Sequence, residues 1–395
     1  MRENPYYQRA LEIQDEIVAN RRKVHGFAEL GFDLPQTVAL VMEQLRSYGY
    51  EPQLVGKAGV TCTVGKGGKV ILIRGDMDAL PMQEETGLPF AAQNGHCHSC
   101  GHDCHTAMLL GAAKLLKEKE NTLKGTVKFM FQPAEELLGG AKDMIENGIL
   151  ENPKVDAALG LHISVGRDYS EVGNVSYARG PANFSGDMIR ITILGQDAHG
   201  SRPDKGVDAI NIAAHTVIAL QEILAREIPC TEHSVLLVGK IEGGTSCNTE
   251  AGKAVLECSV RTTDHEKRDF LKRRVKEIAE GTALTFRGKA VVEYVYGMPP
   301  MVTDEALCDE IGSYCAEMLS PEKVHVMPTS NGTEDFSAVA ERVPATFLML
   351  GAGGVEQGHI YSSHHPKMMV DENALPIGAA LYAYAASRYL ENHEG

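Results

Sequence analysis

The chain has 395 residues, of which 43% are hydrophobic, so it is long enough for two or three domains with sizeable cores. Its formal net charge of −15 comes from acidic residues spread along the chain, which argues against nucleic acid or an anionic membrane surface as a partner. No apolar run suits a signal peptide or a membrane span, so neither is expected. Nine cysteines, mostly in apolar contexts, favour reduced thiols and a cytoplasmic location.

The N-terminal region is predicted to be helical. Apolar residues recur at helical spacing over residues 5–23, which indicates one amphipathic helix. A second helix is predicted to begin at Pro35. His25 lies between them, and we interpret it as a capping or core-edge residue, with a functional role as the alternative.

Two short runs rich in β-branched residues follow, Val60–Val64 and Val70–Arg74, and flanking glycines mark both as strands. Asp76 and Asp78 come after the second run, at the end of a strand where open α/β sheets bind ligands. Either carboxylate could instead cap a turn, and we favour a functional role for Asp78.

The densest group of potential metal ligands is His98–His105, which reads His-Ser-Cys-Gly-His-Asp-Cys-His. Soft and borderline ligands at a junction between a loop and a predicted helix, here Thr106–Leu116, are typical of a transition-metal site. An extended backbone would aim the side chains of Cys100 and His102 in the same direction. Asp103 suits the N-cap of the helix. The alternative is a polar loop that merely contains histidines.

Two further predicted strands end in ligand-type residues. Gly125–Phe131 is followed by Glu135 and Glu136, and Val155–Leu161 is followed by His162. Adjacent carboxylates repel each other unless a cation separates their roles, so one could bind a metal while the other acts as a general base. The alternative for the glutamates is an exposed acidic helix start.

The residue pattern changes after position 183. Residues 184–297 show the order β-α-β-β-α-β, which is typical of a ferredoxin-like α+β module. Helix and strand patterns then alternate again to the end of the chain. The sequence therefore predicts one α/β domain, residues 1–183 and 298–395, interrupted by a smaller α+β domain.

Taken together, these motifs resemble the amidohydrolase branch of the dinuclear aminoacylase/carboxypeptidase metallopeptidases, which includes hippurate hydrolase, auxin-conjugate hydrolase and N-acetyldiaminopimelate deacetylase. The matching motifs span nearly the whole chain: Arg21–Phe32, Arg74–Pro81, His98–His105, Gln132–Glu136, Gly160–His162, Asp197–Pro203, Gly243–Asn248, Gly332–Ser337 and His364–Pro366. The resemblance implies a zinc-peptidase-like, three-layer α/β catalytic domain with an inserted ferredoxin-like lid that forms a homodimer.

The resemblance also implies two divalent metal ions per subunit, with zinc preferred and manganese, nickel or cobalt as alternatives. The implied metal ligands are Cys100, His102, Glu136, His162 and His364. Glu135 is the implied general base, and Asp78 matches an aspartate near the metals. His199 matches a residue that reaches the active site of the partner subunit. Asn248 and Arg261 are candidates for binding the substrate.

The implied reaction is hydrolysis of the amide bond of an N-acyl amino acid, such as an N-acetyl or N-benzoyl derivative, by a metal-activated water. A dipeptidase or desuccinylase of the same clan is the alternative. Cys100 stands where those branches have a metal-bridging aspartate, which favours the amidohydrolase branch. Two other classes are an electron carrier with a cluster on Cys97, Cys100 and Cys104, and an inactive binding module. The interspersed histidines argue against the first, and the retained Glu135 argues against the second.

Three departures from the family pattern leave details open. Cys104 stands where relatives usually have a small residue, so an extra thiol could lie near the metals. Thr249-Glu250 replaces more apolar residues, which affects the expected substrate pocket. His365 is adjacent to His364, and the family pattern favours His364 as the ligand.

Overall fold

The computed structural model describes residues 3–394, which form two compact units. The larger unit comprises residues 3–182, 303–328 and 334–394, and the smaller unit comprises residues 183–302 and 329–333. The prediction placed the insertion at 184–297, so the compact unit is slightly longer and also includes a later segment. A backbone hydrogen bond from Phe184 to Gly332 joins that segment to the smaller unit.

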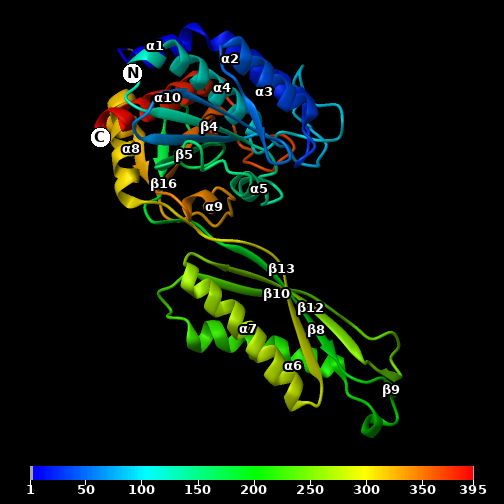
Figure 1. Cartoon of the computed structure of the whole chain (residues 1–395). Coiled ribbons are helices and arrows are strands. Elements are labelled where there is room, and N and C mark those ends of the chain that lie inside the picture. The colour runs from blue at the N-terminus through cyan, green and yellow to red at the C-terminus, as the bar shows by residue number, and fades with distance from the viewer. Residues whose placement is uncertain (1–2, 395) are drawn as a thin grey trace. The chain divides into compact units, whose positions relative to one another are not determined.

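A mixed sheet in the order β1-β2-β4-β3-β5-β16-β6-β15 forms the centre of the larger unit (Figure 1). Its strands are β1 (Gln53–Val55), β2 (Gly59–Gly65), β3 (Val70–Asp76), β4 (Thr126–Gln132), β5 (Ala157–Ser164), β6 (Val175–Tyr177), β15 (Val324–Val326) and β16 (Ala345–Gly351). The four strands β4, β3, β5 and β16 are parallel, and β2 and β6 pair with this block in the antiparallel direction. Parallel strands end at the same edge of a sheet, so the segments after β3, β4 and β5 are brought together there.

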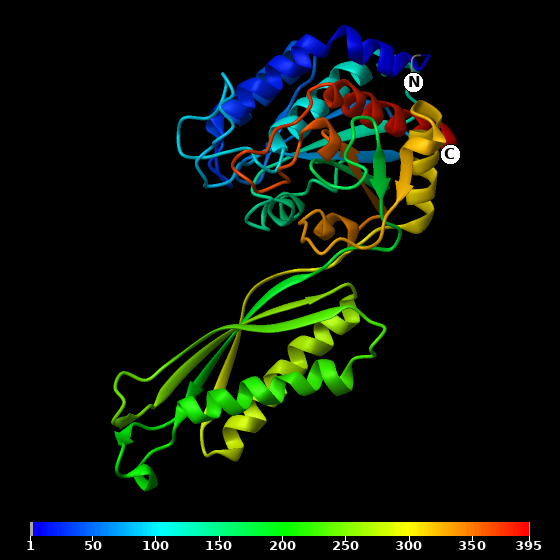
Figure 2. The same ribbon diagram turned by 180° about the vertical axis from the view of Figure 1, so that it is seen from behind.

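Helices cover both faces of this sheet. They are α1 (Pro5–Glu12), α2 (Gln14–Phe27), α3 (Pro35–Ser47), α4 (His102–Glu118), α5 (Gly140–Glu146), α8 (Glu305–Met318), α9 (Ser337–Ala340) and α10 (Ala374–Asn392). Figures 1 and 2 show α2, α4 and α10 on one side of the sheet and α5 and α9 on the other. Helix α4 packs against the sheet and against α2 and α10, so it is buried almost all round. This burial explains its largely apolar sequence.

The prediction of one helix over residues 5–23 is wrong, because the chain forms two helices that meet at Ile13. Ile13 leaves the helical conformation and is buried. Helix α1 packs against α10, whereas α2 packs chiefly against α4, so the break lets both helices bury their apolar faces. Asn4 caps α1 by accepting hydrogen bonds from the amides of Tyr6 and Tyr7.

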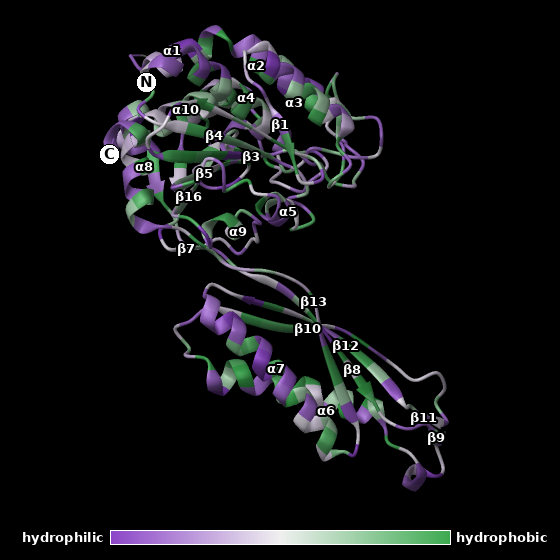
Figure 3. Ribbon diagram, viewed as in Figure 1, coloured by the Kyte–Doolittle hydropathy of each residue, from purple (hydrophilic) through white to green (hydrophobic). Residues whose placement is uncertain are grey.

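The smaller unit has the predicted order β-α-β-β-α-β. Its elements are β8 (Gly186–Leu194), α6 (Ala209–Glu222), β10 (Ser234–Gly243), β12 (Lys253–Thr262), α7 (His265–Thr285) and β13 (Lys289–Met298). The antiparallel sheet has the order β10-β12-β8-β13, and α6 and α7 pack together on one face of it. Figure 3 shows the difference in polarity between the helix and the sheet: α7 carries hydrophilic residues along its length, while the strands are largely hydrophobic.

Short strand pairs complete the fold. β9 (Ala198–His199) pairs with β11 (Thr249–Glu250) in the smaller unit, and β7 (Pro181–Asn183) pairs with β14 (Met301–Val302) where the chain enters and leaves that unit. The use of the smaller unit as a lid or dimer interface stays a prediction.

Candidate metal centre

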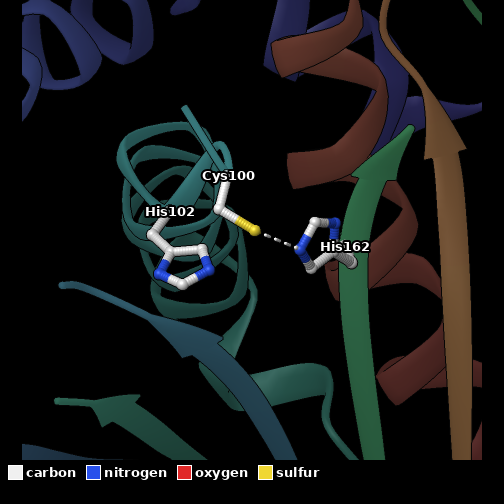
Figure 4. A group of neighbouring side chains, drawn as sticks. All are labelled: Cys100, His102 and His162. Atoms are coloured by element: carbon white, nitrogen blue, oxygen red, sulfur yellow. Dashed lines mark hydrogen bonds between the residues drawn. The ribbon is translucent and has the colours of Figure 1, made fainter. Parts of the chain in front are cut away.

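The five predicted metal ligands lie together at the carboxyl edge of the parallel strands in the larger unit. Figure 4 shows the Sγ atom of Cys100 pointing at Nε2 of His162, 3.4 Å away, with His102 beside them. Nε2 of His102 lies 3.9 Å from Oε1 of Glu136, and Nε2 of His364 lies 3.3 Å from the same oxygen. Ligand atoms of Cys100, His102 and His162 form one group within 4.8 Å, and those of Cys100, Glu136 and His364 form another. Cys100 therefore belongs to both groups.

The local backbone differs from the prediction, although the side chains converge. Cys100 and His102 are not on an extended strand, because Gly101 between them has a φ of 92° and His102 is the first residue of α4. A Cβ atom on Gly101 would lie 2.3 Å from Cδ1 of Ile163, so both the backbone conformation and the packing require glycine. The prediction of Asp103 as the N-cap is wrong, because this residue lies in the first turn of α4 and faces the interior.

The adjacent histidines near the C-terminus have different surroundings. His364 reaches Glu136 from a backbone with a φ of 67°. His365 instead accepts a hydrogen bond from the amide of Lys367 and stacks on Tyr361. The geometry therefore favours His364 over His365 as the ligand.

The donor atoms fit a metal ion on their own chemistry. Both ring nitrogens of His102 and Oε1 of Glu136 are buried without a hydrogen-bond partner among the described residues. Buried polar atoms are normally paired, so these orphaned atoms indicate a missing cationic partner. Thiolate, imidazole and carboxylate donors together suit zinc and related transition metals.

Asp78 contacts both the turn that carries the two glutamates and the predicted ligand His102. Its carboxylate accepts hydrogen bonds from the backbone amides of Glu135 and Glu136, at 3.0 and 3.2 Å. Its Oδ1 also lies 3.4 Å from Nδ1 of His102. Asp78 therefore fixes the turn that carries both glutamates and lies directly behind one predicted ligand, which fits its expected place near the metals.

The two adjacent glutamates have opposite electrostatic surroundings. Burial, together with the charges of Glu334 and Asp335, raises the pKa of Glu135 well above its ordinary value. Burial also acts to raise the pKa of Glu136, but its close contact with His364 and the charge of His102 outweigh burial and lower it. Neighbouring carboxyl groups with pKa values shifted in opposite directions are suited to different roles.

The sequence analysis gave no role to Arg74, Glu334 or Asp335, which are buried behind the centre. Arg74 has no solvent exposure and binds Asp76 and Glu334, each at 2.8 Å. Burial raises the pKa of Asp335 to about 8 despite the nearby guanidinium. Two features of the sequence could have predicted this buried network: an arginine inside an otherwise apolar strand, and the acidic pair in the motif Gly332–Ser337.

A second buried network holds the start of α4. Asp103 binds Arg21 at 2.7 Å and His25 at 2.8 Å, and the other ring nitrogen of His25 contacts Glu84. The interpretation of His25 as a structural residue fits this position. Cys104 is fully buried, and burial raises the pKa of its thiol. Among the described residues, neither Cys104 nor Cys97 belongs to a group of potential metal ligands, so no extra thiol lies in the centre.

The position of His25 predicts a pH-dependent contribution to stability. Burial lowers the pKa of His25, but its hydrogen bonds to Asp103 and Glu84 outweigh burial and raise it to about 9. An unfolded histidine titrates near 6.5, so this stabilisation is fully present below about pH 6.5 and is lost as the pH rises through 9. The expected loss is about 3 kcal/mol.

The measurement compares thermal unfolding of the wild type and His25→Phe at about pH 6 and about pH 10, beyond both pKa values. We expect the difference in Tm between the two proteins to narrow at the higher pH. An unchanged difference would mean that His25 is neutral in the folded protein.

The remaining predicted residues lie in the smaller unit. His199 is exposed, and its Nδ1 accepts hydrogen bonds from the amide and hydroxyl of Ser201. The alternative was a turn histidine bonded to Asp197. His199 is bonded within its turn, but to Ser201, while Asp197 accepts from the amide of Gly252. The pairing of β9 with β11 brings His199 next to Asn248, since the amide of Gly200 donates to the carbonyl of Asn248.

Arg261, the other predicted substrate-binding residue, lies on β12 and is half-buried. Its guanidinium donates to the hydroxyl of Thr333 at 3.2 Å. The structure thus places Arg261 on a strand of the four-stranded sheet, and His199 and Asn248 at the β9–β11 pair.

In the described part of the chain, no helix has both the length and the apolar character needed to cross a membrane. At the edge of this α/β sheet, imidazole and carboxylate groups from the strand ends meet a thiol from the loop before α4, which is an arrangement suited to metal-assisted hydrolysis.

Comparison with known proteins identifies the family. Residues 72–388 match Peptidase family M20/M25/M40. The chain is 36% identical over 387 residues to N-acetyl-L-cysteine deacetylase of Bacillus subtilis (strain 168), covering 97% of this chain and 90% of the relative. It is 35% identical over 383 residues to IAA-amino acid hydrolase ILR1-like 4 of Arabidopsis thaliana, covering 95% and 86%.

A solved structure agrees with this assignment. The Bacillus subtilis YXEP protein, described as a dinuclear metal binding peptidase from the M20 family, is 31% identical and has a TM-score of 0.83, covering 96% of this chain and 99% of that one. The chain therefore belongs to the M20/M25/M40 peptidase family and is a hydrolase of that family, which confirms the resemblance seen in its motifs.

Proposed function

We propose that this protein hydrolyses the amide bond of N-acyl amino acids, such as N-acetyl or N-benzoyl derivatives, with two divalent metal ions. The observation that carries the proposal is the convergence of Cys100, His102 and His162 with Glu136 and His364, which leaves Glu135 beside the donors. The names of the two relatives, a deacetylase of N-acetylcysteine and a hydrolase of an amino-acid conjugate, support an N-acyl amino acid as the substrate.

The metal ions, zinc in the first instance, would supply a Lewis acid that polarises the amide carbonyl and lowers the pKa of the attacking water. Glu135 accepts the proton of that water and transfers it to the leaving amine. Asp78 holds Glu135 in place by accepting a hydrogen bond from the backbone amide of Glu135.

The smaller unit supplies the contacts to the substrate in this proposal. His199 stabilises the developing oxyanion from a partner subunit, with Ser201 fixing the ring through Nδ1. Arg261 binds the free carboxylate of the amino acid, and Asn248 binds near the amide. The unit then acts as a lid and as the interface of a homodimer, and the enzyme works in the cytoplasm.

A substrate screen tests the proposal. Metal-free protein is loaded separately with zinc, manganese, nickel and cobalt and assayed on N-acetyl, N-benzoyl and N-succinyl amino acids and on dipeptides. We expect the N-acetyl or N-benzoyl compounds to give the highest kcat/KM. Turnover of dipeptides or succinyl compounds alone would overturn the proposal in favour of the dipeptidase or desuccinylase alternative.

We expect His199→Ala to reduce kcat by about a hundredfold or more, as for loss of an oxyanion-stabilising group, while the metal content stays unchanged. The residue is exposed and distant in sequence from the ligands, so its loss should not disturb the fold. Kinetics and metal analysis on the same sample provide the measurement. His233→Ala, which removes another exposed histidine of the smaller unit, is the matched control and should leave kcat unchanged.

Mixing His199→Ala with Glu135→Gln tests action across the dimer. If His199 acts in the partner's site, a mixed dimer contains one site with both groups intact, so part of the activity should return. Subunit exchange is first demonstrated with differently tagged chains. No recovery after exchange would defeat the assignment across the dimer.

A further inference from the structure

A chain of buried hydrogen bonds extends behind His162. The Nδ1 atom of His162 contacts the carbonyl oxygen of Ile163 at 2.6 Å, so its N–H donates there and Nε2 is left facing Cys100. The amide of the same residue, Ile163, donates to Nε2 of His105 at 2.9 Å. The backbone that orients a predicted ligand is therefore held by a second histidine, which is fully buried in the first turns of α4.

These contacts define the tautomer of His105. Because Nε2 accepts from the amide of Ile163, it carries no hydrogen, so the hydrogen of the neutral ring is on Nδ1. That nitrogen donates to Oδ1 of Asp76. The carboxylate thus selects the only ring form that can accept the backbone amide, in the way that outer carboxylates fix the histidines of metal sites.

The second oxygen of Asp76 faces another predicted ligand. Oδ2 lies 3.6 Å from Nε2 of His102 and 2.8 Å from Nη1 of Arg74. Asp76, His102, His105 and Arg74 have no solvent exposure. The carboxylate of Asp76 therefore contacts the ligand His102 directly and is linked to the ligand His162 through His105. It is held by the guanidinium of Arg74, which cannot lose its charge.

We propose that Asp76 and His105 are positioning residues for the metal centre, with His105 fixing the ring of His162 through the backbone at Ile163 and Asp76 fixing His105. This inference rests on the proposed ligand set, and it does not depend on which substrate is hydrolysed. Both residues lie outside the set of predicted ligands. Loss of either side chain should lower the affinity for the ion that His162 binds.

The experiment titrates Co²⁺ into metal-free wild type, His105→Phe and Asp76→Asn, with calorimetry for affinity and visible absorption for coordination. The wild type should bind two ions. Both variants should bind one ion with unchanged affinity and the other about 10–100-fold more weakly, with altered d–d bands, because an outer partner of a ligating histidine contributes about that much.

His25→Phe provides a matched control. His25 is also a buried histidine that contacts carboxylates, Asp103 and Glu84, but it contacts no predicted ligand. Its replacement should lower Tm while both Co²⁺ affinities stay within about twofold, well below the loss for an outer partner.

Four results would overturn the inference: wild-type affinities in His105→Phe, equal weakening of both ions, the same selective loss in His25→Phe, or no Co²⁺ binding by the wild type. The last would also refute the metal centre itself. Normal Co²⁺ binding by a wild type that hydrolyses no N-acyl amino acid would refute only the proposed substrate.

Discussion

Replacement of Glu135 by glutamine is expected to reduce amide hydrolysis by at least about a hundredfold while both metal ions stay bound. The glutamine side chain keeps the shape of glutamate but cannot accept the proton of the attacking water. Glu135 lies beside the ligands, with its Oε2 atom 3.9 Å from Nε2 of His102. Its backbone amide is anchored by Asp78, so the substitution leaves the turn unchanged.

Turnover and metal content are measured on the same preparation of Glu135→Gln. Glu136→Gln serves as the matched control, because it makes the same chemical change one residue away. We expect that variant to lose metal, since Oε1 of Glu136 is the atom that approaches His102 and His364. Full activity in Glu135→Gln would show that another group is the base.

The sequence was most informative where strands end. Asp78 and Glu136 come after β3 and β4, and His162 lies near the end of β5. The parallel pairing of these strands brings the three residues to one edge of the sheet. That convergence follows from strand direction alone, so a pattern of apolar runs ending in ligand-type residues was sufficient to predict it. The β-α-β-β-α-β order of residues 184–297 was likewise visible in hydrophobic periodicity.

The network behind the site could not be predicted in the same way. Arg74 and Glu334 are 260 positions apart, and their pairing depends on how the chain returns to the sheet after the insertion. Asp103 looked like a helix cap because short polar residues favour that position. The structure instead uses it to bind Arg21 in the interior, a tertiary contact that overrides the local preference.

The short strands were missed for a different reason. β6 has only three residues, Val175–Tyr177, and is defined by its pairing with β15 and β16. A three-residue segment carries too little periodicity to be distinguished from a loop. The break at Ile13 is similar, because the apolar spacing continues across it and only the packing of α1 and α2 reveals it.

Removal of the Cys100 side chain in Cys100→Ala is expected to have the largest effect on metal binding. Its Sγ atom lies within 4.8 Å of donor atoms of His102 and His162 in one group, and of Glu136 and His364 in the other. A donor that is shared by both groups cannot be lost without weakening both ions. The affinities for both ions should fall by more than about a hundredfold. A fall of about a hundredfold is the upper end of what is expected when a residue that only hydrogen-bonds to a metal ligand is removed.

His102→Ala should lose metal as well, because its ring nitrogens have no hydrogen-bond partner among the described residues and face carboxylates of the centre. Cys97→Ala is the matched control, since it also removes one sulfur atom from a buried position. Cys97 pairs with Leu80 through its backbone and belongs to no ligand group in residues 3–394, so this variant should bind two metal ions like the wild type. Equal loss in all three variants would instead favour a cluster held by several cysteines. Metal analysis after dialysis against a weak chelator distinguishes these outcomes. If Cys100 is a shared thiolate ligand, Cys100→Ala loses metal. If Cys97 is a buried thiol that binds no metal, Cys97→Ala keeps it.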